Sequence, residues 1–298
     1  MKIRCLIENN ETPFFISEHG LSLLIEFNNK KILFDTGKTS SFLNNAKKLN
    51  IDLKNIDYLV LSHAHYDHTG GVIDFIRENN FKKDIFVGTN FKANKYSLED
   101  GNYIYKGTPF KIEELNNLKY VDNELKIDNI YLLNNFKELN NYEKINDKFY
   151  VLKNKTYEKD LFTDELVLAI DTPTGLILFV GCSHVGICNI IDQVKNRLNK
   201  NIRGVIGGFH LSTYNSDYAL KIINKLKDYN LEFISPLHCS GHEKLFKQEF
   251  KNKCKMLYSG DFFTIDEKNK EYKTKQNKAL DDLYGEQTDR NYKDGDRN

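Results

Sequence analysis

Residues 56–71 read IDYLVLSHAHYDHTGG, and this stretch decides how the rest of the chain is interpreted. The run Ile56 to Leu61 predicts a buried strand, and Val72 to Arg77 has the apolar spacing of a helix. Three histidines and an aspartate therefore lie in the loop between a strand and a helix. With 8 histidines in 298 residues, three at these offsets arise by chance at about one start position in 50,000.

The loop offers two groups of metal-binding side chains. Because alternate side chains of an extended segment point the same way, His63 and His65 can hold one ion while Asp67 and His68 face a second. Imidazole suits zinc, iron and manganese, and a carboxylate adds negative charge beside a divalent ion. We expect a divalent transition-metal cofactor, two zinc ions in the first instance, with iron or manganese as alternatives. The simpler alternative is a solvated loop with surface histidines.

The overall composition restricts the partners of the protein. Lys and Arg total 43 and Asp and Glu total 42, so the net charge of +1 creates no field that would concentrate nucleic acid or an anionic membrane. We find no apolar signal segment and no apolar run of membrane length, and the five scattered cysteines do not suggest a disulfide framework. We expect a cytoplasmic protein that acts on a small-molecule substrate, without a nucleic-acid or membrane partner.

Strand and helix patterns alternate along most of the chain. The predicted strands are Lys2–Glu8, Leu21–Phe27, Lys31–Asp35, Ile56–Leu61, Leu166–Ile170, Leu176–Gly181, Arg203–Gly208 and Phe233–Leu237. The predicted helices are Ser40–Leu49, Val72–Arg77, a helix after Gly186 that runs to about Leu198, Tyr218–Leu226 and Glu243–Phe250. Histidines follow the last two strands, at His210 and His238.

The patterns indicate one domain over residues 1–266. Within it, residues 90–160 are rich in Asn, Lys, Glu and Tyr with weak periodicity, and we expect a variable insertion or a lid there. Residues 267–298 are charged and carry few apolar side chains. Such a segment cannot bury enough apolar surface to order itself, so we expect a disordered tail.

Several short segments resemble those of a known family. The signature His-x-His-x-Asp-His of the metallo-β-lactamase superfamily is present in the loop, preceded by Leu33-Phe34-Asp35-Thr36-Gly37 and followed by Gly70-Gly71. Four more segments resemble the branch named for dihydropterin-ribofuranosylaminobenzene phosphate synthase. These are Glu18-His19-Gly20-Leu21-Ser22, Gly181-Cys182-Ser183-His184, Gly207-Gly208-Phe209-His210 and Pro236-Leu237-His238-Cys239. The resemblance implies an α+β fold, an αββα sandwich of two mixed sheets with flanking helices.

The resemblance also implies a set of metal ligands. These are His63, His65, Asp67, His68 and His238. The family's Gly-His-Thr ligand motif is absent, and Gly181-Cys182 stands where a bridging aspartate usually follows a glycine. We expect His184 to be the compensating ligand and Cys182 to pack beside the site, because a bridging thiolate would be easily oxidised. A direct ligand role for Cys182 is the open alternative.

Three further residues are candidates for roles around the metals. His210 ends a strand at the same edge and is, with Asp67, our candidate catalytic residue; it contacts the substrate or supports a ligand, or else is structural. His19 is a weaker candidate of the same kind. Asp35 either accepts an N–H bond from a ligand histidine or caps its turn.

The leading functional prediction is a metal-dependent hydrolase in which a metal-activated water molecule attacks a small-molecule ester, lactone or phosphoester. The alternative keeps the metal site in a transferase-like synthase, which joins a dihydropterin to a ribofuranosylaminobenzene phosphate, as the branch name implies. A metal-dependent binding protein without catalysis is a third hypothesis, which the complete loop motif disfavours.

Overall fold

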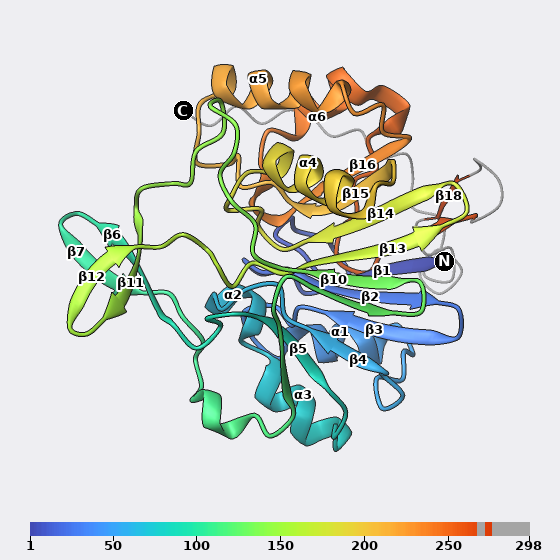
Figure 1. Cartoon of the computed structure of the whole chain (residues 1–298). Helices are drawn as coiled ribbons and strands as arrows, with labels where there is room; N and C mark the ends of the chain where they lie inside the picture. The colour runs from blue at the N-terminus through green and yellow to red at the C-terminus, as the bar shows by residue number, and fades with distance from the viewer. Residues whose placement is uncertain (267–271, 276–298) are drawn as a thin grey trace.

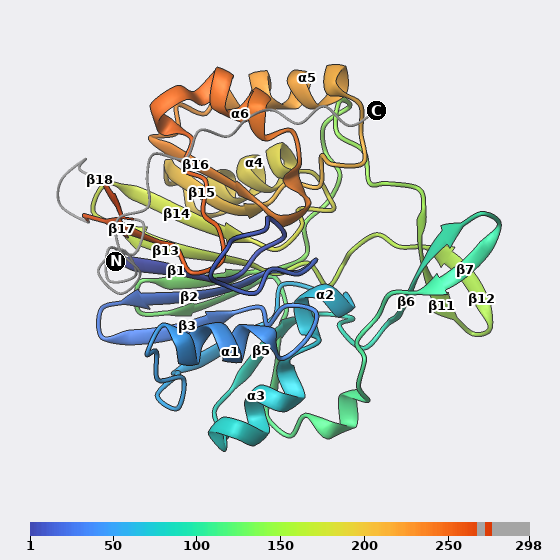
Figure 2. The same ribbon diagram turned by 180° about the vertical axis from the view of Figure 1, so that it is seen from behind.

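Two main sheets lie face to face in the computed structural model, which describes residues 1–266 and 272–275 (Figure 1, Figure 2). In order across the first sheet, the strands are β18 (Tyr272–Lys275), β17 (Phe262–Ile265), β1 (Lys2–Ile7), β2 (Ser22–Phe27), β3 (Lys30–Phe34), β4 (Tyr58–Val60), β5 (Ile85–Gly88) and β8 (Leu118–Val121). Across the second sheet they are β16 (Phe233–Leu237), β15 (Ile202–Gly208), β14 (Gly175–Val180), β13 (Val167–Thr172), β10 (Ile130–Leu133) and β9 (Glu124–Ile127).

Three layers of apolar side chains hold this sandwich together. The middle layer lies between the sheets, where Phe34 of the first sheet packs against Phe179 of the second. The outer face of the first sheet is covered by α1 (Ser41–Lys48) and α3 (Val72–Asn79), and that of the second by α4 (Ile187–Leu198), α5 (Ser216–Lys227) and α6 (Glu243–Phe250). The predicted α+β class and αββα sandwich are therefore confirmed.

The strand directions bring five loops to one edge of the sandwich. Both sheets are mixed: β3 runs parallel to β4, and β14, β15 and β16 run parallel to one another, while the hairpins β2–β3 and β13–β14 are antiparallel. Parallel strands end on the same side of a sheet. The five loops follow β3, β4, β14, β15 and β16. In that order, they carry Asp35, His63, Cys182, His210 and His238.

A smaller four-stranded sheet, here called the satellite sheet, stands beside that edge. Its strands are β12 (Thr156–Lys159), β11 (Phe149–Lys153), β6 (Asn94–Glu99) and β7 (Asn102–Tyr105). It projects from the sandwich near α2 (Tyr66–Thr69) (Figure 1). The prediction of residues 90–160 as one insertion needs correction, because η1 (Ile112–Glu114), β8, β9 and β10 lie between the satellite strands and these three strands join the main sheets.

The chain's last described segment is β18, which pairs antiparallel with β17 at the edge of the first sheet. The predicted tail at 267–298 otherwise lies outside the described residues. Two short turns, η2 (His238–Ser240) and η3 (Lys251–Lys253), complete the described elements. Among all of these, no helix has the length and apolar character needed to cross a membrane.

Candidate metal centre

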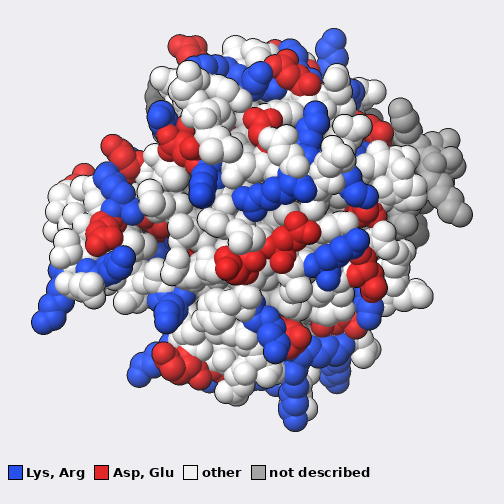
Figure 3. Space-filling view, viewed as in Figure 1, with Lys and Arg blue, Asp and Glu red and all other residues white. Residues whose placement is uncertain are grey.

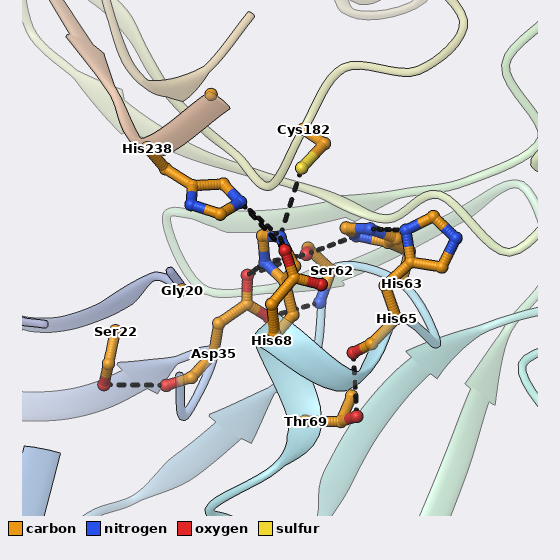
Figure 4. A network of polar contacts seen from close by, with 12 residues as sticks. Gly20, Ser22, Asp35, Ser62, His63, His65, His68, Thr69, Cys182 and His238 are labelled. Atoms are coloured by element: carbon orange, nitrogen blue, oxygen red, sulfur yellow. Dashed lines mark hydrogen bonds and ion pairs between the residues drawn. The ribbon is translucent and has the colours of Figure 1, made fainter. Parts of the chain in front are cut away.

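The loop after β4 and the start of α2 direct His63, His65 and His68 into the seam between the sheets (Figure 4), and Asp67 of α2 is buried beside them. His63, His65, Asp67 and His68 are each at most 6% exposed. His63 Nε2 lies 3.1 Å from His65 Nδ1, and Asp67 Oδ2 lies 3.9 Å from His68 Nε2. The alternative of solvated surface histidines is therefore wrong.

Asp35 fixes the orientation of His68. It follows β3 with a left-handed backbone (φ 58°) and is fully buried. The N–H and hydroxyl of Ser62 each donate a 2.7 Å hydrogen bond to its carboxylate, whose Oδ2 also lies 2.7 Å from His68 Nδ1. Burial alone lowers the pKa of His68, but the carboxylates of Asp35 and Asp67 outweigh it and raise the pKa to about 9. Because Asp35 holds Nδ1 of His68, the Nε2 atom of the same ring is turned toward the interior of the site.

His238 approaches the same point from the second sheet. Its Nε2 lies 3.2 Å from both His68 Nε2 and Asp67 Oδ2. Its Nδ1 donates to Asn9 Oδ1 at 2.7 Å, and its backbone N–H donates to Glu8 Oε1 at 2.8 Å. Sequence reasoning missed Asn9 and Glu8 in this role, because no motif distinguishes the loop after β1.

His184 follows β14 and lies on the other side of the seam. Its ring stacks on Phe162 with centroids 3.8 Å apart and an interplanar angle of 10°. The ring centroids of His63 and His65 are 5.0 Å and 4.9 Å away. The backbone N–H of His184 donates to Glu165 Oε1 at 2.7 Å. The position of His184 is thus fixed by its ring contact with Phe162 and by its backbone hydrogen bond to Glu165.

Several buried ring nitrogens in this seam have no hydrogen-bond partner among the described residues. They are His65 Nε2 and both ring nitrogens of His184 and of His210. Each such atom costs roughly 1–3 kcal/mol when it stays unpaired, so a group of them needs an explanation. Burial lowers the pKa of His63, His65 and His184 well below its ordinary value, and neutral imidazole is the form that binds metal. The donor set therefore fits divalent metal ions.

Potential ligand atoms form four overlapping sets of three, and within each set they lie within 4.8 Å of one another. The sets are His63 with Cys182 and His184, His68 with Cys182 and His238, His19 with Asp67 and His238, and Cys182 with His210 and Cys239. The sets contain every predicted ligand except His65, whose Nδ1 lies beside His63 Nε2 at 3.1 Å, and Asp35 lies behind His68. Which of them bind metal remains a prediction.

A buried ion cluster behind the loop was also missed by sequence reasoning. The Lys95 ammonium group lies 2.6 Å from Asp160 Oδ2 and 2.8 Å from Asp164 Oδ1. The other oxygen of Asp164 accepts the N–H of Ala64, between two of the histidines, at 2.9 Å. The acidic pair Asp164-Glu165 directly before a buried strand was the available signal. Lys95, in a segment of weak periodicity, gave none.

A cavity of about 330 Å³ opens above the histidines. Three parts of the chain contribute to its lining: residues 62–68, here called the metal loop, the residues at the strand ends of the second sheet, and the satellite sheet. Its walls include His19, His65, Tyr66, Asp67, Ser97, Glu99, Lys106, Asn146, Lys148, Phe149, Cys182, His184, His210, Ser212, Thr213, His238 and Cys239. A small molecule in this cavity would lie directly against the candidate ligands.

An αββα sandwich with buried His, Asp and Cys side chains gathered at its strand ends is a fold with a candidate metal site. The metallo-beta-lactamase superfamily model matches residues 18–129. The chain belongs to this superfamily, because two curated relatives exceed 30% identity over nearly their whole length.

These relatives both come from Methanocaldococcus jannaschii. An uncharacterized protein is 32% identical over 262 residues, which cover 82% of this chain and 93% of the relative. The 7,8-dihydropterin-6-methyl-4-(beta-D-ribofuranosyl)-aminobenzene-5'-phosphate synthase is 35% identical over 267 residues, covering 84% and 90%. The crystal structure of Tm1679, a metal-dependent hydrolase of the beta-lactamase superfamily, is 34% identical with a TM-score of 0.77, and the match covers 89% of this chain and 99% of that one.

Proposed function

We propose that this protein is a metal-dependent hydrolase of a small molecule with an ester, lactone or phosphoester bond. The supporting observation is the group of buried, unpartnered ring nitrogens on His65 and His184 at the floor of an open cavity. Unpaired nitrogens in a dry, structural core would only destabilise it. At the floor of a cavity they are available to a metal and its substrate.

The ligands divide into two neighbouring sites. His63 and His184, with the adjacent His65, would hold one divalent ion. His68 and His238, with the adjacent Asp67, would hold the other, and zinc is the first candidate. Bound metal would lower the pKa of a water molecule and stabilise negative charge on the group under attack. Asp35 would fix the His68 ring for its ion through the 2.7 Å contact.

Two residues around the metals face the substrate space. Asp67 Oδ2 lies 3.1 Å from His19 Nε2 and 3.2 Å from His238 Nε2, so its carboxylate is held in one orientation. The His210 ring lies 4.3 Å from that of His184 on the cavity wall, with neither nitrogen paired. His210 is therefore placed to donate to, or accept from, a polar group of the substrate.

The satellite-sheet side of the cavity favours an anionic substituent. Lys106, Lys148 and Glu99 line the cavity from this sheet, and Glu99 pairs with Lys106 at 2.8 Å. The other carboxylate of the lining, Asp67, is a candidate metal ligand, so the two ammonium groups exceed the remaining carboxylate by one charge. A phosphate on the substrate would be attracted to this side while its reactive bond lies over the histidines.

A second candidate function is supported by the 35% identical relative, whose name describes a synthase that makes a pterin-linked aminobenzene phosphate. The aromatic walls Tyr66 and Phe149 could stack on flat rings of such a substrate, and the lysines could bind its phosphate. The metal site is shared by both candidates. They differ in whether water or an aromatic amine is the acceptor.

We further propose a cytoplasmic location and no nucleic-acid or membrane partner. None of the five cysteines, all of which lie in the described part of the chain, forms a disulfide. Basic and acidic side chains are interspersed on the described face seen in Figure 3, without a broad basic area. These observations support a small molecule as the partner.

One set of measurements on purified protein tests both candidates. Elemental analysis after reloading should give one to two equivalents of transition metal; less than about a tenth of an equivalent would contradict the metal site. The loaded protein is then incubated with ester, lactone and phosphodiester panels and, separately, with a dihydropterin diphosphate plus the aminobenzene riboside phosphate. Hydrolysis alone supports the first candidate, and a coupled product supports the second.

A further inference from the structure

The sulfur atom of Cys182 lies in the middle of the candidate metal ligands. Cys182 follows β14 and is 3% exposed, and its side chain points toward His68 and His238 (Figure 4). Its Sγ lies 3.1 Å from His68 Nε2. A packing side chain at this depth would be surrounded by apolar atoms, whereas this sulfur faces imidazole nitrogens.

The same sulfur is shared by the two groups of ligands. Cys182 lies within 4.8 Å of the ligand nitrogens of His63 and His184 on one side, and of those of His68 and His238 on the other. Among the sets found in the described residues, it is the one member common to both groups. An atom that belongs to two neighbouring groups of candidate ligands is in the position of a bridging ligand.

The backbone around Cys182 is arranged to keep it there. Ser183 has a left-handed φ of 58°, and its hydroxyl donates to the Gly208 carbonyl at 2.8 Å. The Gly208 N–H donates to the Gly181 carbonyl at 2.9 Å. A Cβ on Gly208 would lie 3.3 Å from the Cys182 Cα and 2.6 Å from the Cys239 sulfur, so glycine is required for this close approach.

The charge of the ligand set also calls for a second anion. The histidines are neutral ligands, and among the candidate ligands of the two sites Asp67 is the one carboxylate. Glu165 is nearby, but its two oxygens accept the N–H groups of His184 and Val185. Two divalent ions bring four positive charges, and a thiolate shared by the two ligand groups would add a negative charge to both.

We propose that the Cys182 thiolate binds both metal ions as a bridging ligand, an inference that rests on the two-metal site of the proposed function. It reverses the sequence-based expectation that Cys182 packs beside the site. That expectation considered the oxidation of a thiolate but not its burial, and Cys182 is 3% exposed among the histidines that line the cavity. Zinc accepts thiolate ligands readily, with a bond of about 2.3 Å.

The test uses the full chain, stripped of metal and reloaded with Co²⁺ or Zn²⁺. The wild-type cobalt protein should show sulfur-to-metal charge-transfer absorption, and the zinc protein should show a sulfur neighbour at about 2.3 Å in X-ray absorption. Cys182→Ser should lose both signals. Cys239→Ser is the matched control: it removes the neighbouring buried thiol and should keep both signals.

A second variant separates bridging from packing. Cys182→Asp restores an anionic side chain, so it should retain about two equivalents of metal without the sulfur signals, whereas Cys182→Ser should fall to about one. Circular dichroism tests whether each variant is folded. If a variant is not folded, the wild-type spectra decide whether sulfur binds metal.

Two bound equivalents without a sulfur signal in wild type would overturn the bridge and leave the proposed function intact. Failure of wild type to bind metal at all would overturn the proposed function itself. Loss of the signal in Cys239→Ser but not in Cys182→Ser would assign the sulfur ligand to Cys239 and overturn the proposal.

Discussion

Four residues at the ends of strands have left-handed backbone conformations although none is glycine. They are Asp35, Ser183, His210 and His238, with φ between 49° and 58°. Such a conformation costs roughly 1–2 kcal/mol for an L-residue. All four lie in the site or adjoin it, and the turn redirects the chain as it leaves the strand. Sequence motifs identified Asp35, His210 and His238 as candidate site residues. Their backbone conformations could not be predicted, because these conformations depend on the neighbouring strands.

The unpaired nitrogens of His184 lead to a prediction about metal-free protein. His184→Leu removes two buried polar atoms without partners while keeping a similar volume, so the metal-free variant should be at least as stable as metal-free wild type. The metal content should fall by about half, and the metal-loaded variant should melt lower than loaded wild type. Calorimetry with and without chelator, combined with elemental analysis, measures this. Full metal content in the variant would remove His184 from the ligands.

Asp35 should act on the metal through His68. Asp35→Ala leaves the Ser62 N–H and the His68 Nδ1 without their acceptor, so we expect a loss of roughly 1–3 kcal/mol in stability and a 10–100-fold loss in metal affinity. Chemical denaturation and competition with a metal chelator measure the two effects. Asp228→Ala, at a side chain 64% exposed, is the control and should change neither. Unchanged affinity in Asp35→Ala would show that His68 needs no support.

At the scale of elements, burial decided what the sequence could reveal. The hairpin β13–β14 and the units β15–α5 and β16–α6 were predicted to within two residues at every end, because each has one face or both faces in the core. The satellite sheet was missed. All four residues of β7 are exposed, and the sheet is held partly by tyrosine contacts such as Tyr103 on Tyr157, with ring centroids 3.6 Å apart. A sheet without a buried apolar face leaves no period-2 signal.

The satellite sheet is attached to the metal loop at two points. Lys95 of β6 pairs with Asp164, which accepts the N–H of Ala64, and the Lys106 carbonyl accepts the N–H of Tyr66 at 3.0 Å. Both N–H groups lie between candidate ligands in the sequence. The position of this sheet is therefore coupled to the geometry of the loop.

Lys95→Met tests this attachment. The change leaves Asp160 and Asp164 buried without their cation, so we expect a loss of about 3–5 kcal/mol in the free energy of unfolding. Metal affinity should fall with it, because Asp164 is no longer fixed against the loop. Denaturant titration and chelator competition provide the measurements. Lys119→Met, an exposed lysine with a carboxylate 4.0 Å away, should change stability by less than about 0.5 kcal/mol. Equal effects of the two substitutions would contradict a buried anchor.

At the scale of the whole molecule, the sequence predicted one domain and a disordered tail, and the described part of that tail contains a strand. β18 pairs with β17 through four residues, which covers an edge that would otherwise be open. A four-residue polar segment in a charged stretch has no apolar pattern of its own. Its position follows from the open edge of the first sheet, which the local sequence does not encode.

Two truncations distinguish the parts of this segment. Removal of residues 276–298 should change the free energy of unfolding by less than about 0.5 kcal/mol, because their composition is charged and poor in apolar residues. Removal of residues 267–298 deletes β18 as well and should cost roughly 1–3 kcal/mol in lost strand pairing. Thermal melting and light scattering measure stability and association. Identical melting curves for the two truncations would show that β18 contributes nothing.

The candidate ligands come from opposite sheets and from distant parts of the chain, since His68 and His238 are 170 residues apart and their Nε2 atoms lie 3.2 Å from each other. Ions bound between them would tie the first and last thirds of the polypeptide together, and separation of the sheets would require release of the ions. Chelation should therefore shorten the survival of the protein in the presence of proteases more than it alters its shape. In a cell, the abundance of this protein would then follow the supply of the metal as well as the rate of its synthesis.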